Sequence, residues 1–393
     1  MDNFNYHAPT KIVFGKDTEL KVGKLLKKAG ATKVLVHYGG SSAKSSGLLD
    51  RVFSSLAEAG LGWAELGGVV PNPRLSKVYE GVELCLESKA DFILAVGGGS
   101  VIDSAKAIGY GVNNGGDVWD LYSGARLPEK GCLPVAAIVT IPAAGSEMSN
   151  VSVITKEEGW LKRSTASDHG FCRFAIMNPC LTYSLPPYQT ASGAVDIMMH
   201  TLERYFAGTG TLDLSDALGE SLLRSVMYNA KVLLHEPHNY EARANIMWAS
   251  SLSHNGVTGD RNFGDWACHQ LEHELGGMFD VAHGAGLSAV WGSWARYVCS
   301  QNPSRFARLA VSLFNLPLHF TDHERTALEG ISAMEDFFRS IGMPTSITEL
   351  GVSLTEEQIK ELAYKCSFMG KRTIGGFKVL SIPDIEEIYR MAR

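Results

Sequence analysis

Three histidines lie close together between residues 264 and 284, with a spacing that suits a metal ion. His269 and His273 stand four residues apart in a run of helical character, so both imidazoles project from one face, about a turn apart. The glycine pair 276–277 predicts the end of that helix, and His283 follows near the start of another helical run. A helix, a short loop and a helix start can aim three imidazoles at one point, as a metal requires.

An acid and a histidine form a second group upstream. Asp196 and His200 are again four residues apart, among apolar residues that predict a largely buried helix. A lone buried charge is costly, and one cation shared with the histidines of 264–284 would satisfy both groups. The alternative, hydrogen-bonded core histidines, stays open for this set. We expect that ordinary role, or a solvated one, for three other histidines: His254, His235 and His169.

A glycine-rich segment, 97–100, follows the apolar run 91–96 and precedes a helical pattern. Glycines between a strand and a helix let backbone N–H groups approach a phosphate, and the helix dipole favours the anion. The spacing is not GxGxxG, and a tight turn that binds nothing explains the segment equally well. A second loop of small residues, 140–147, adds support, because both loops would lie at the carboxyl edge of a sheet, where open α/β folds bind ligands.

The predicted secondary structure differs between the two halves of the chain. Apolar strand patterns at 10–14, 33–37, 63–66 and 91–96 alternate with helical patterns, which indicates a parallel sheet covered on both faces. Strand patterns stop near residue 180, and helical patterns continue to the C-terminus. We therefore predict an α/β fold with a Rossmann-like parallel-sheet domain over residues 1–182 and an all-helical metal-binding domain over residues 183–393.

Composition excludes several classes of protein. The chain has 393 residues, 45% of them hydrophobic, and a net charge of −6, which favours neither nucleic acid nor an anionic membrane as partner. The seven cysteines are scattered without a CxxC pair, as expected of reduced thiols. The start of the chain shows no signal-peptide pattern, and the longest apolar stretch is too short to cross a bilayer. We expect a soluble cytoplasmic protein that binds a small molecule.

Taken together, the motifs resemble one family, the iron-containing (group III) alcohol dehydrogenases. Within it, they are most similar to the NAD(P)H-dependent butanol dehydrogenases and broad aldehyde reductases. The matching pieces, in the family's order, are YGGSSAKSSG, PNP, VGGGSVIDSAKAI, TIPAAGSEMS, SGAVDIMMH and ACHQLEHELGGMFDVAHGAG. The resemblance implies a dehydroquinate synthase-like fold, a homodimer, and an NAD(P)-dependent enzyme that interconverts short-chain primary alcohols, such as butanol, and aldehydes.

The resemblance also implies a metal centre. The family's ion is Fe(II), or Zn(II) in some members, and three imidazoles with one carboxylate suit either ion. His273 matches a histidine near the metal that is not a ligand, and its implied catalytic role is to relay a proton between the alcohol and solvent. The implied metal ligands are Asp196, His200, His269 and His283.

The implied cofactor is a nicotinamide dinucleotide. NAD-preferring relatives often carry at position 39 an Asp, which accepts from the adenosine ribose and repels a 2′-phosphate. Small residues, hydroxyls and Lys44 follow Gly39 here, so we expect NADP(H), with NAD(H) as the alternative. Ala143 and Ala144, in a shortened loop, leave phosphate contacts to the backbone. The implied cofactor-binding residues are Gly39, Gly40, Ser41, Asn72, Gly98, Gly99, Ser100, Asp103, Thr140, Ser149, Lys162 and Leu181.

Two other kinds of function are compatible with parts of the sequence. A polyol dehydrogenase or a dehydroquinate synthase-like lyase would share the fold, but the lyase needs clustered basic residues, and the metal motifs contain none. A nucleotide-binding sensor without catalysis is the non-enzymatic alternative, and the intact metal motifs with His273 argue against it. The charged residues Asp260, Arg261 and Asp265 are interpreted as a solvated loop.

Overall fold

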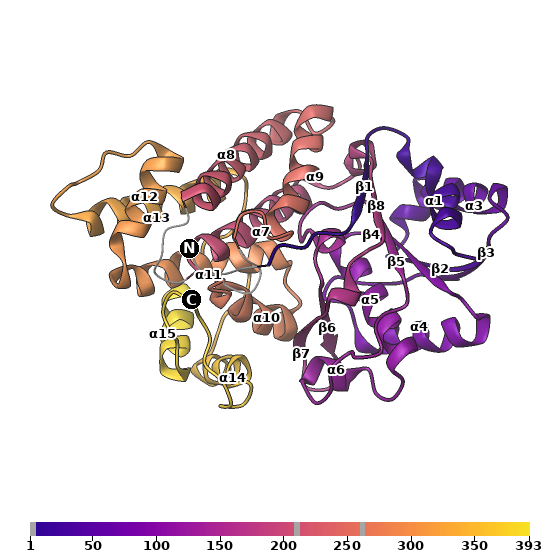
Figure 1. Cartoon of the computed structure of the whole chain (residues 1–393). Coiled ribbons are helices and arrows are strands. Elements are labelled where there is room, and N and C mark those ends of the chain that lie inside the picture. Colours follow the sequence, from indigo (N-terminus) through magenta and orange to yellow (C-terminus); the bar gives the residue numbers. More distant parts are fainter. Residues whose placement is uncertain (1–4, 208–212, 260–263) are drawn as a thin grey trace. The chain divides into compact units, whose positions relative to one another are not determined.

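The computed structural model describes residues 5–207, 213–259 and 264–393, which form two compact units. One unit comprises His7–Leu185, and the other comprises the described residues of Pro186–Arg393 together with Asn5 and Tyr6. Figure 1 shows that the strands belong to the first unit, whereas the second unit is built of helices. The predicted fold class, a parallel-sheet domain and an all-helical domain, is confirmed.

The first unit contains a six-stranded sheet in which every neighbouring pair is parallel. Its central strands are apolar and fully buried, which is the pattern of a sheet covered on both faces. The order along the sheet is β1 (Lys11–Phe14), β8 (Phe174–Met177), β5 (Val135–Val139), β4 (Phe92–Gly97), β2 (Lys33–Tyr38) and β3 (Gly62–Leu66).

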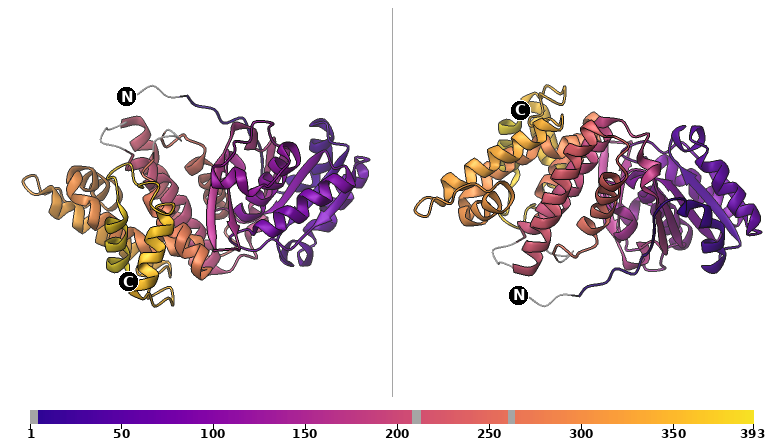
Figure 2. Two further views of the ribbon diagram at one scale, coloured as in Figure 1. Left: turned by 90° about the horizontal axis from the view of Figure 1, so that it is seen from below. Right: turned by 90° about the horizontal axis from the view of Figure 1, so that it is seen from above.

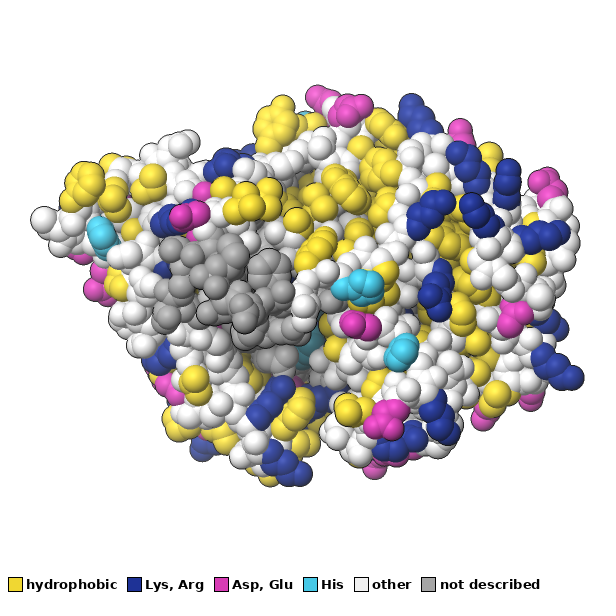
Figure 3. Space-filling model, in the orientation of Figure 1, with side chains coloured by type: hydrophobic (Ala, Val, Ile, Leu, Met, Phe, Trp, Pro, Cys, Tyr) yellow, Lys and Arg dark blue, Asp and Glu magenta, His cyan; other side chains and the backbone are white. Residues whose placement is uncertain are grey.

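Helices cover the sheet because their apolar stripes face it. In α1 (Val22–Lys28), Val22 and Leu26 are buried whereas the lysines between and after them are exposed. Basic side chains accordingly gather over the region of α1 and α3 on the face shown in Figure 3. Figure 2 shows the layers from two further sides. The other helices of this unit are α2 (Ser42–Ser45), α3 (Leu48–Glu58), α4 (Leu75–Ser88), α5 (Gly99–Asn114) and α6 (Trp119–Ser123).

This unit also contains a small antiparallel pair of strands that the sequence patterns did not predict. Strands β6 (Val151–Lys156) and β7 (Leu161–Ala166) form a separate two-stranded sheet. Polar and charged residues occupy much of both strands, so they lack the apolar run that marks the central strands. The hairpin packs, through β6, against α5, whose first residues belong to the glycine-rich segment 97–100.

The helical unit is organised around α7 (Pro187–Tyr205), whose residues are buried without a break from Ala191 to Tyr205. It packs against α8, α9 and α11, and one continuous core joins most of these helices. No helix within the described parts of the chain combines the length and apolar character of a membrane span. The other helices are α8 (Asp213–His235), α9 (Tyr240–His254), α10 (Ala267–Phe279), α11 (His283–Val298), α12 (Pro303–Phe314), α13 (His323–Ser340), α14 (Glu356–Cys366) and α15 (Ile382–Ala392).

Candidate functional site

Asp196, on α7, lies at the centre of the four side chains predicted as metal ligands. Its Oδ1 atom is 3.5 Å from His200 Nδ1, 3.7 Å from His269 Nε2 and 3.7 Å from His283 Nε2. In a tetrahedral site with metal–ligand distances of about 2.1 Å, the ligand atoms lie about 3.4 Å apart. The ligand atoms of Asp196, His200 and His269 therefore lie at a spacing that suits one small cation, and His283 approaches the same oxygen of Asp196.

Three atoms of this group are buried without a hydrogen-bond partner: Asp196 Oδ1, His200 Nδ1 and His269 Nε2. Leaving a buried polar atom unsatisfied costs about 1–3 kcal/mol, so three of them converging on one point need a physical reason. A divalent cation would satisfy all three. Three imidazoles and one carboxylate are a donor set that Fe(II) and Zn(II) both accept, so the residues fit such an ion.

Three helices supply these side chains. Asp196 and His200 project from adjacent turns of α7, His269 comes from the first turn of α10, and His283 is the first residue of α11. Gly284 allows the start of α11 to approach α7, because a Cβ at this position would lie 1.9 Å from the carbonyl oxygen of Ser192. A larger residue at position 284 would push His283 away from Asp196.

Two buried glutamates stand behind the histidines, and the sequence analysis missed both. Glu203 Oε1 lies 3.0 Å from His269 Nδ1, and Glu272 Oε2 contacts His283 Nδ1. Each contact uses the ring nitrogen opposite the one that faces Asp196, which is how carboxylates commonly orient metal-binding histidines. Their positions three residues after His200 and His269 were the available signal in the sequence.

The histidines of the group differ in protonation. Burial lowers the pKa of His200 well below its usual value, and the nearby His254 and His269 act in the same direction. Burial also opposes a charge on His269, but the neighbouring carboxylates of Asp196 and Glu203 favour the charged imidazole and raise the pKa of His269 to about 9. A metal-binding imidazole must be deprotonated at the binding nitrogen, so metal binding here would release a proton.

Two further histidines border the group. His273 on α10 is buried, and its ring centroid lies 5.9 Å from that of His283. His254, for which we expected only a core or solvated role, ends α9 with its ring centroid 4.1 Å from that of His200. The sequence analysis therefore did not anticipate that His254 adjoins the predicted ligands.

Asp265, which was predicted to lie in a solvated loop, is buried. It is only 3% exposed, and its carboxylate accepts backbone N–H groups of Ala267, Gly376 and Phe377. The prediction of a solvated residue was wrong, because the partners come from a loop more than a hundred residues away. Asp260 and Arg261, predicted with it, lie outside the described residues.

The glycine-rich turn lies where the sequence analysis expected it, between β4 and α5. Gly98 caps the N-terminus of α5, and Gly99 is the first of its 16 residues. The loop after β5 packs closely against both glycines. A Cβ on Gly98 would lie 2.9 Å from Ile141 Cβ, and one on Gly99 would lie 3.0 Å from Ala144 Cβ. Glycine is therefore needed for this approach, and the start of a long helix remains suited to a phosphate.

The predicted nucleotide residues gather at the carboxyl ends of neighbouring strands. β2 and β4 are neighbours in the sheet. The chain leaves β2 toward β3, at one edge of the sheet, and leaves β4 toward β5, in the opposite direction, so the two connections diverge between β2 and β4. Open α/β sheets bind ligands at such a point. Residues 39–41 follow β2, residues 98–100 follow β4, and Thr140 follows β5, its N–H bonded to the carbonyl of Gly97 at 3.0 Å.

The remaining predicted nucleotide residues lie on other elements. Asn72 is buried in the left-handed region at φ 53°, beside a turn whose Pro73 carbonyl binds the N–H of Thr155 on β6. Lys162 pairs with Thr155 from β7. Asp103 lies on α5, Ser149 is buried just before β6, and Leu181 lies in the 3-10 turn Pro179–Thr182 after β8.

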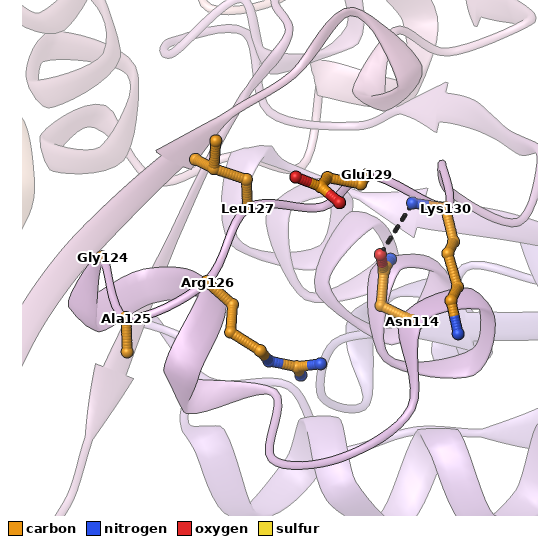
Figure 4. Close-up of a pocket in the computed structure, with 7 residues that line it drawn as sticks. All are labelled: Asn114, Gly124, Ala125, Arg126, Leu127, Glu129 and Lys130. Atoms are coloured by element: carbon orange, nitrogen blue, oxygen red, sulfur yellow. Dashed lines mark hydrogen bonds between the residues drawn. The ribbon is translucent and has the colours of Figure 1, made fainter.

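A pocket of about 380 Å³ lies elsewhere in the same unit, around the loop that follows α6 (Figure 4). Arg126 donates to the carbonyls of Gly115 and Asp117, and Asn114 accepts the N–H of Lys130. These polar groups serve the loop itself, so we assign the pocket no ligand.

The sequence matches two family models that together span most of the chain. One, described as iron-containing alcohol dehydrogenase, covers residues 9–179, and the other, described as Fe-containing alcohol dehydrogenase family, C-terminal, covers residues 190–393. The chain belongs to the iron-containing alcohol dehydrogenase family. The resemblance predicted from the motifs is thus confirmed.

Relatives named for different activities are similar to the chain over its whole length. It is 39% identical to the probable NADH-dependent butanol dehydrogenase 1 of Bacillus subtilis, with 99% of each chain covered. It is 33% identical to the NADPH-dependent aldehyde reductase YqhD of Escherichia coli, with 100% of each covered. The crystal structure of NADH-dependent butanol dehydrogenase A from Thermotoga maritima superposes with a TM-score of 0.95 at 38% identity, covering 100% of this chain and 99% of that one.

Proposed function

We propose that this protein is a metal-dependent, NAD(P)H-linked alcohol dehydrogenase that interconverts short-chain primary alcohols and aldehydes. The supporting observation is the convergence of Asp196, His200 and His269, whose facing atoms are buried and unsatisfied, with His283 beside them. The relatives named as butanol dehydrogenases and as an aldehyde reductase support the substrate class. In this proposal the unit His7–Leu185 binds the nucleotide, and the helical unit binds the metal and the substrate.

In this proposal the residues of the site have different roles. Asp196, His200, His269 and His283 hold the ion, and Glu203 and Glu272 orient two of the imidazoles. When bound, the ion supplies a Lewis acid for the alcohol or aldehyde oxygen, and the nicotinamide supplies or accepts the hydride. His273 takes the proton of the alcohol during oxidation and returns it during aldehyde reduction.

The identity of the two cofactors is the finer part of the proposal. We propose Fe(II) as the ion, with Zn(II) as the alternative that the same donor set accepts. We propose NADP(H) because Gly39, Gly40 and Ser41 leave room for a 2′-phosphate, whereas the NADH-dependent names of several relatives favour the alternative. The homodimer and the cytoplasmic location stay predictions.

Metal analysis and reduction of butanal test the central proposal. Protein purified anaerobically should contain close to one equivalent of iron or zinc, and chelation should abolish NADPH oxidation by butanal. Activity should return when Fe(II) or Zn(II) is added separately, and the two rates identify the preferred ion. Full turnover by metal-free protein would refute the proposal.

Two comparisons complete this experiment. Replacing His283 with Ala should remove both metal and turnover, whereas replacing His235, an exposed histidine of α8, should change neither. A panel of short aldehydes and polyols, each measured with NADH and NADPH, separates an aldehyde reductase from a polyol dehydrogenase. Nucleotide binding without turnover on any of them would favour the sensor instead.

A further inference from the structure

A buried lysine on α5, Lys106, has no part in the chemistry proposed above. Its side chain is 0% exposed, and a buried ammonium group is costly unless its hydrogen bonds are made. Nζ donates to the carbonyls of Ser146 at 2.7 Å, Ser149 at 2.8 Å and Val151 at 2.9 Å. The hydroxyl of Ser146 also lies 3.2 Å from Nζ, so the three N–H donors of the ammonium group all have acceptors.

An acid one turn earlier on α5 holds the same segment. Asp103 accepts the hydroxyl of Ser146 at 2.5 Å through Oδ1 and the N–H of Val153 at 3.0 Å through Oδ2. Its backbone carbonyl accepts the hydroxyl of Ser152 at 2.8 Å. Residues three apart on a helix share a face, so Asp103 and Lys106 together attach residues 146–153 to α5 by opposite charges.

This attached segment continues the loop that packs on the glycine turn. Ile141 and Ala144 lie against Gly98 and Gly99 at the start of α5, and the chain then runs through residues 146–151 to Lys106, near the middle of that helix. Ser149 belongs to this segment and is one of the residues proposed to line the nucleotide. The loop is therefore held to α5 at two places about two turns apart.

The buried charge of Lys106 has a structural reason, because it holds the second part of the loop 140–151 to α5. The carbonyls of Ser146, Ser149 and Val151 all point at one Nζ atom, so they have a common orientation that only a cation with several donors satisfies. Without it, three buried carbonyls would need other partners, and the loop would rearrange to find them. Ile141 and Ala144 would then shift against the glycine turn.

We propose that Lys106 is a positioning residue that holds the loop 140–151 in the conformation that binds the dinucleotide. The inference rests on the proposed nucleotide site, although not on any particular substrate. Lys106 itself contacts no reacting atom in this account. Its effect is on nucleotide affinity, and it leaves the metal group in the helical unit unchanged.

The test uses the full-length enzyme and the variant Lys106→Met, which keeps a chain of similar length without the charge. NADPH titration followed by fluorescence should show the Kd raised about tenfold or more, as expected for losing hydrogen bonds to a charged group. Metal content should match wild type, and kcat at saturating NADPH should change far less than KM for NADPH. A folded variant with an unchanged Kd would overturn the proposal, as would a loss confined to metal content.

Two further variants keep the test decisive. Lys156→Met, at the last residue of β6, removes an ion pair with Glu158 in the turn that follows. It should leave the Kd unchanged, which controls for loss of a lysine. If Lys106→Met does not fold, Ser146→Ala removes the hydroxyl that donates to Asp103 and accepts from Lys106 Nζ at 3.2 Å, while the carbonyl of residue 146 stays in place. This variant should raise the Kd by a smaller factor, and an unchanged Kd would overturn the proposal. Wild-type protein that binds NADPH but reduces no aldehyde would refute the proposed function without affecting this inference.

Discussion

His269 is bound twice by a single oxygen of Glu203. Oε1 of Glu203 lies 3.0 Å from the ring nitrogen Nδ1 of His269 and accepts the backbone N–H of the same residue at 3.0 Å. α7, which carries Asp196 and His200, thereby sets both the start of α10 and the orientation of the imidazole. With Nδ1–H donated to Glu203, Nε2, which faces Asp196, is the ring nitrogen that can bind a metal once it has lost its proton.

Replacing Glu203 with Gln should weaken metal binding. The amide keeps the size of the side chain but loses the charge that holds the Nδ1–H tautomer of His269, so we expect metal affinity to fall about 10- to 100-fold. Competition with a chelator of known affinity measures the change. Glu241→Gln, at an exposed position on α9, is the matched control. Equal affinity in both variants would mean that Glu203 does not orient the ligand.

Replacing His273 with Asn should slow turnover by about 10²- to 10⁴-fold, the range expected for losing a general acid–base group. Metal content should be unchanged, and the pH profile of kcat/KM should lose one ionisation. The companion variant is His254→Asn, because His254 also adjoins the metal group, through His200. If His254→Asn abolishes turnover while His273→Asn does not, the proton relay belongs to His254.

Replacing Gly39 with Asp should shift cofactor preference toward NADH. A Cβ at this position would meet only the carbonyl oxygen of Val69 at 3.5 Å and Val101 Cγ2 at 3.8 Å, so a side chain fits. The carboxylate would repel a 2′-phosphate and accept a hydrogen bond from a ribose hydroxyl. We expect kcat/KM for NADPH to fall about tenfold or more, with that for NADH little changed or raised. An equal fall with both cofactors would place the 2′-phosphate elsewhere.

His37, on β2, should make the protein less stable in mild acid. Burial lowers its pKa to about 4, while its ring nitrogens bond the carbonyl of Leu66 and the hydroxyl of Ser104, each at 2.9 Å. Because the pKa of the unfolded chain is higher, near 6.5, the folded state resists protonation. This contribution is fully present above pH 6.5 and is lost as pH falls toward 4, by roughly 3 kcal/mol in total.

Urea unfolding at several pH values tests this expectation. The free energy of unfolding of His37→Gln should vary less between pH 6.5 and pH 4 than that of wild type. His235→Gln, at an exposed position, should follow the wild-type curve. Parallel curves for all three proteins would show that another group causes the acid sensitivity.

Residues close in sequence were the ones whose arrangement could be predicted. Helical periodicity placed Asp196 with His200, and His269 with His273, on shared faces, because the geometry of a helix depends only on local spacing. Alternation of apolar strands and helices likewise indicated the parallel sheet and the glycine turn at its carboxyl edge. Spacing and the cost of a buried charge also suggested one cation shared by both groups, and the family motifs added that His273 is not a ligand.

The amino-acid sequence by itself determined the types of the chemical groups and the helices and strands that carry them. Tertiary packing alone decided that the ring nitrogens of His269 on α10 and His283 on α11 come within 3.7 Å of Asp196 on α7. It also decided that Glu203 lies behind His269 and that Asp265 is buried. The same holds for Lys106, whose three carbonyl partners lie 40 to 45 residues later. These contacts join elements distant along the chain, and no local periodicity encodes which elements will pack together.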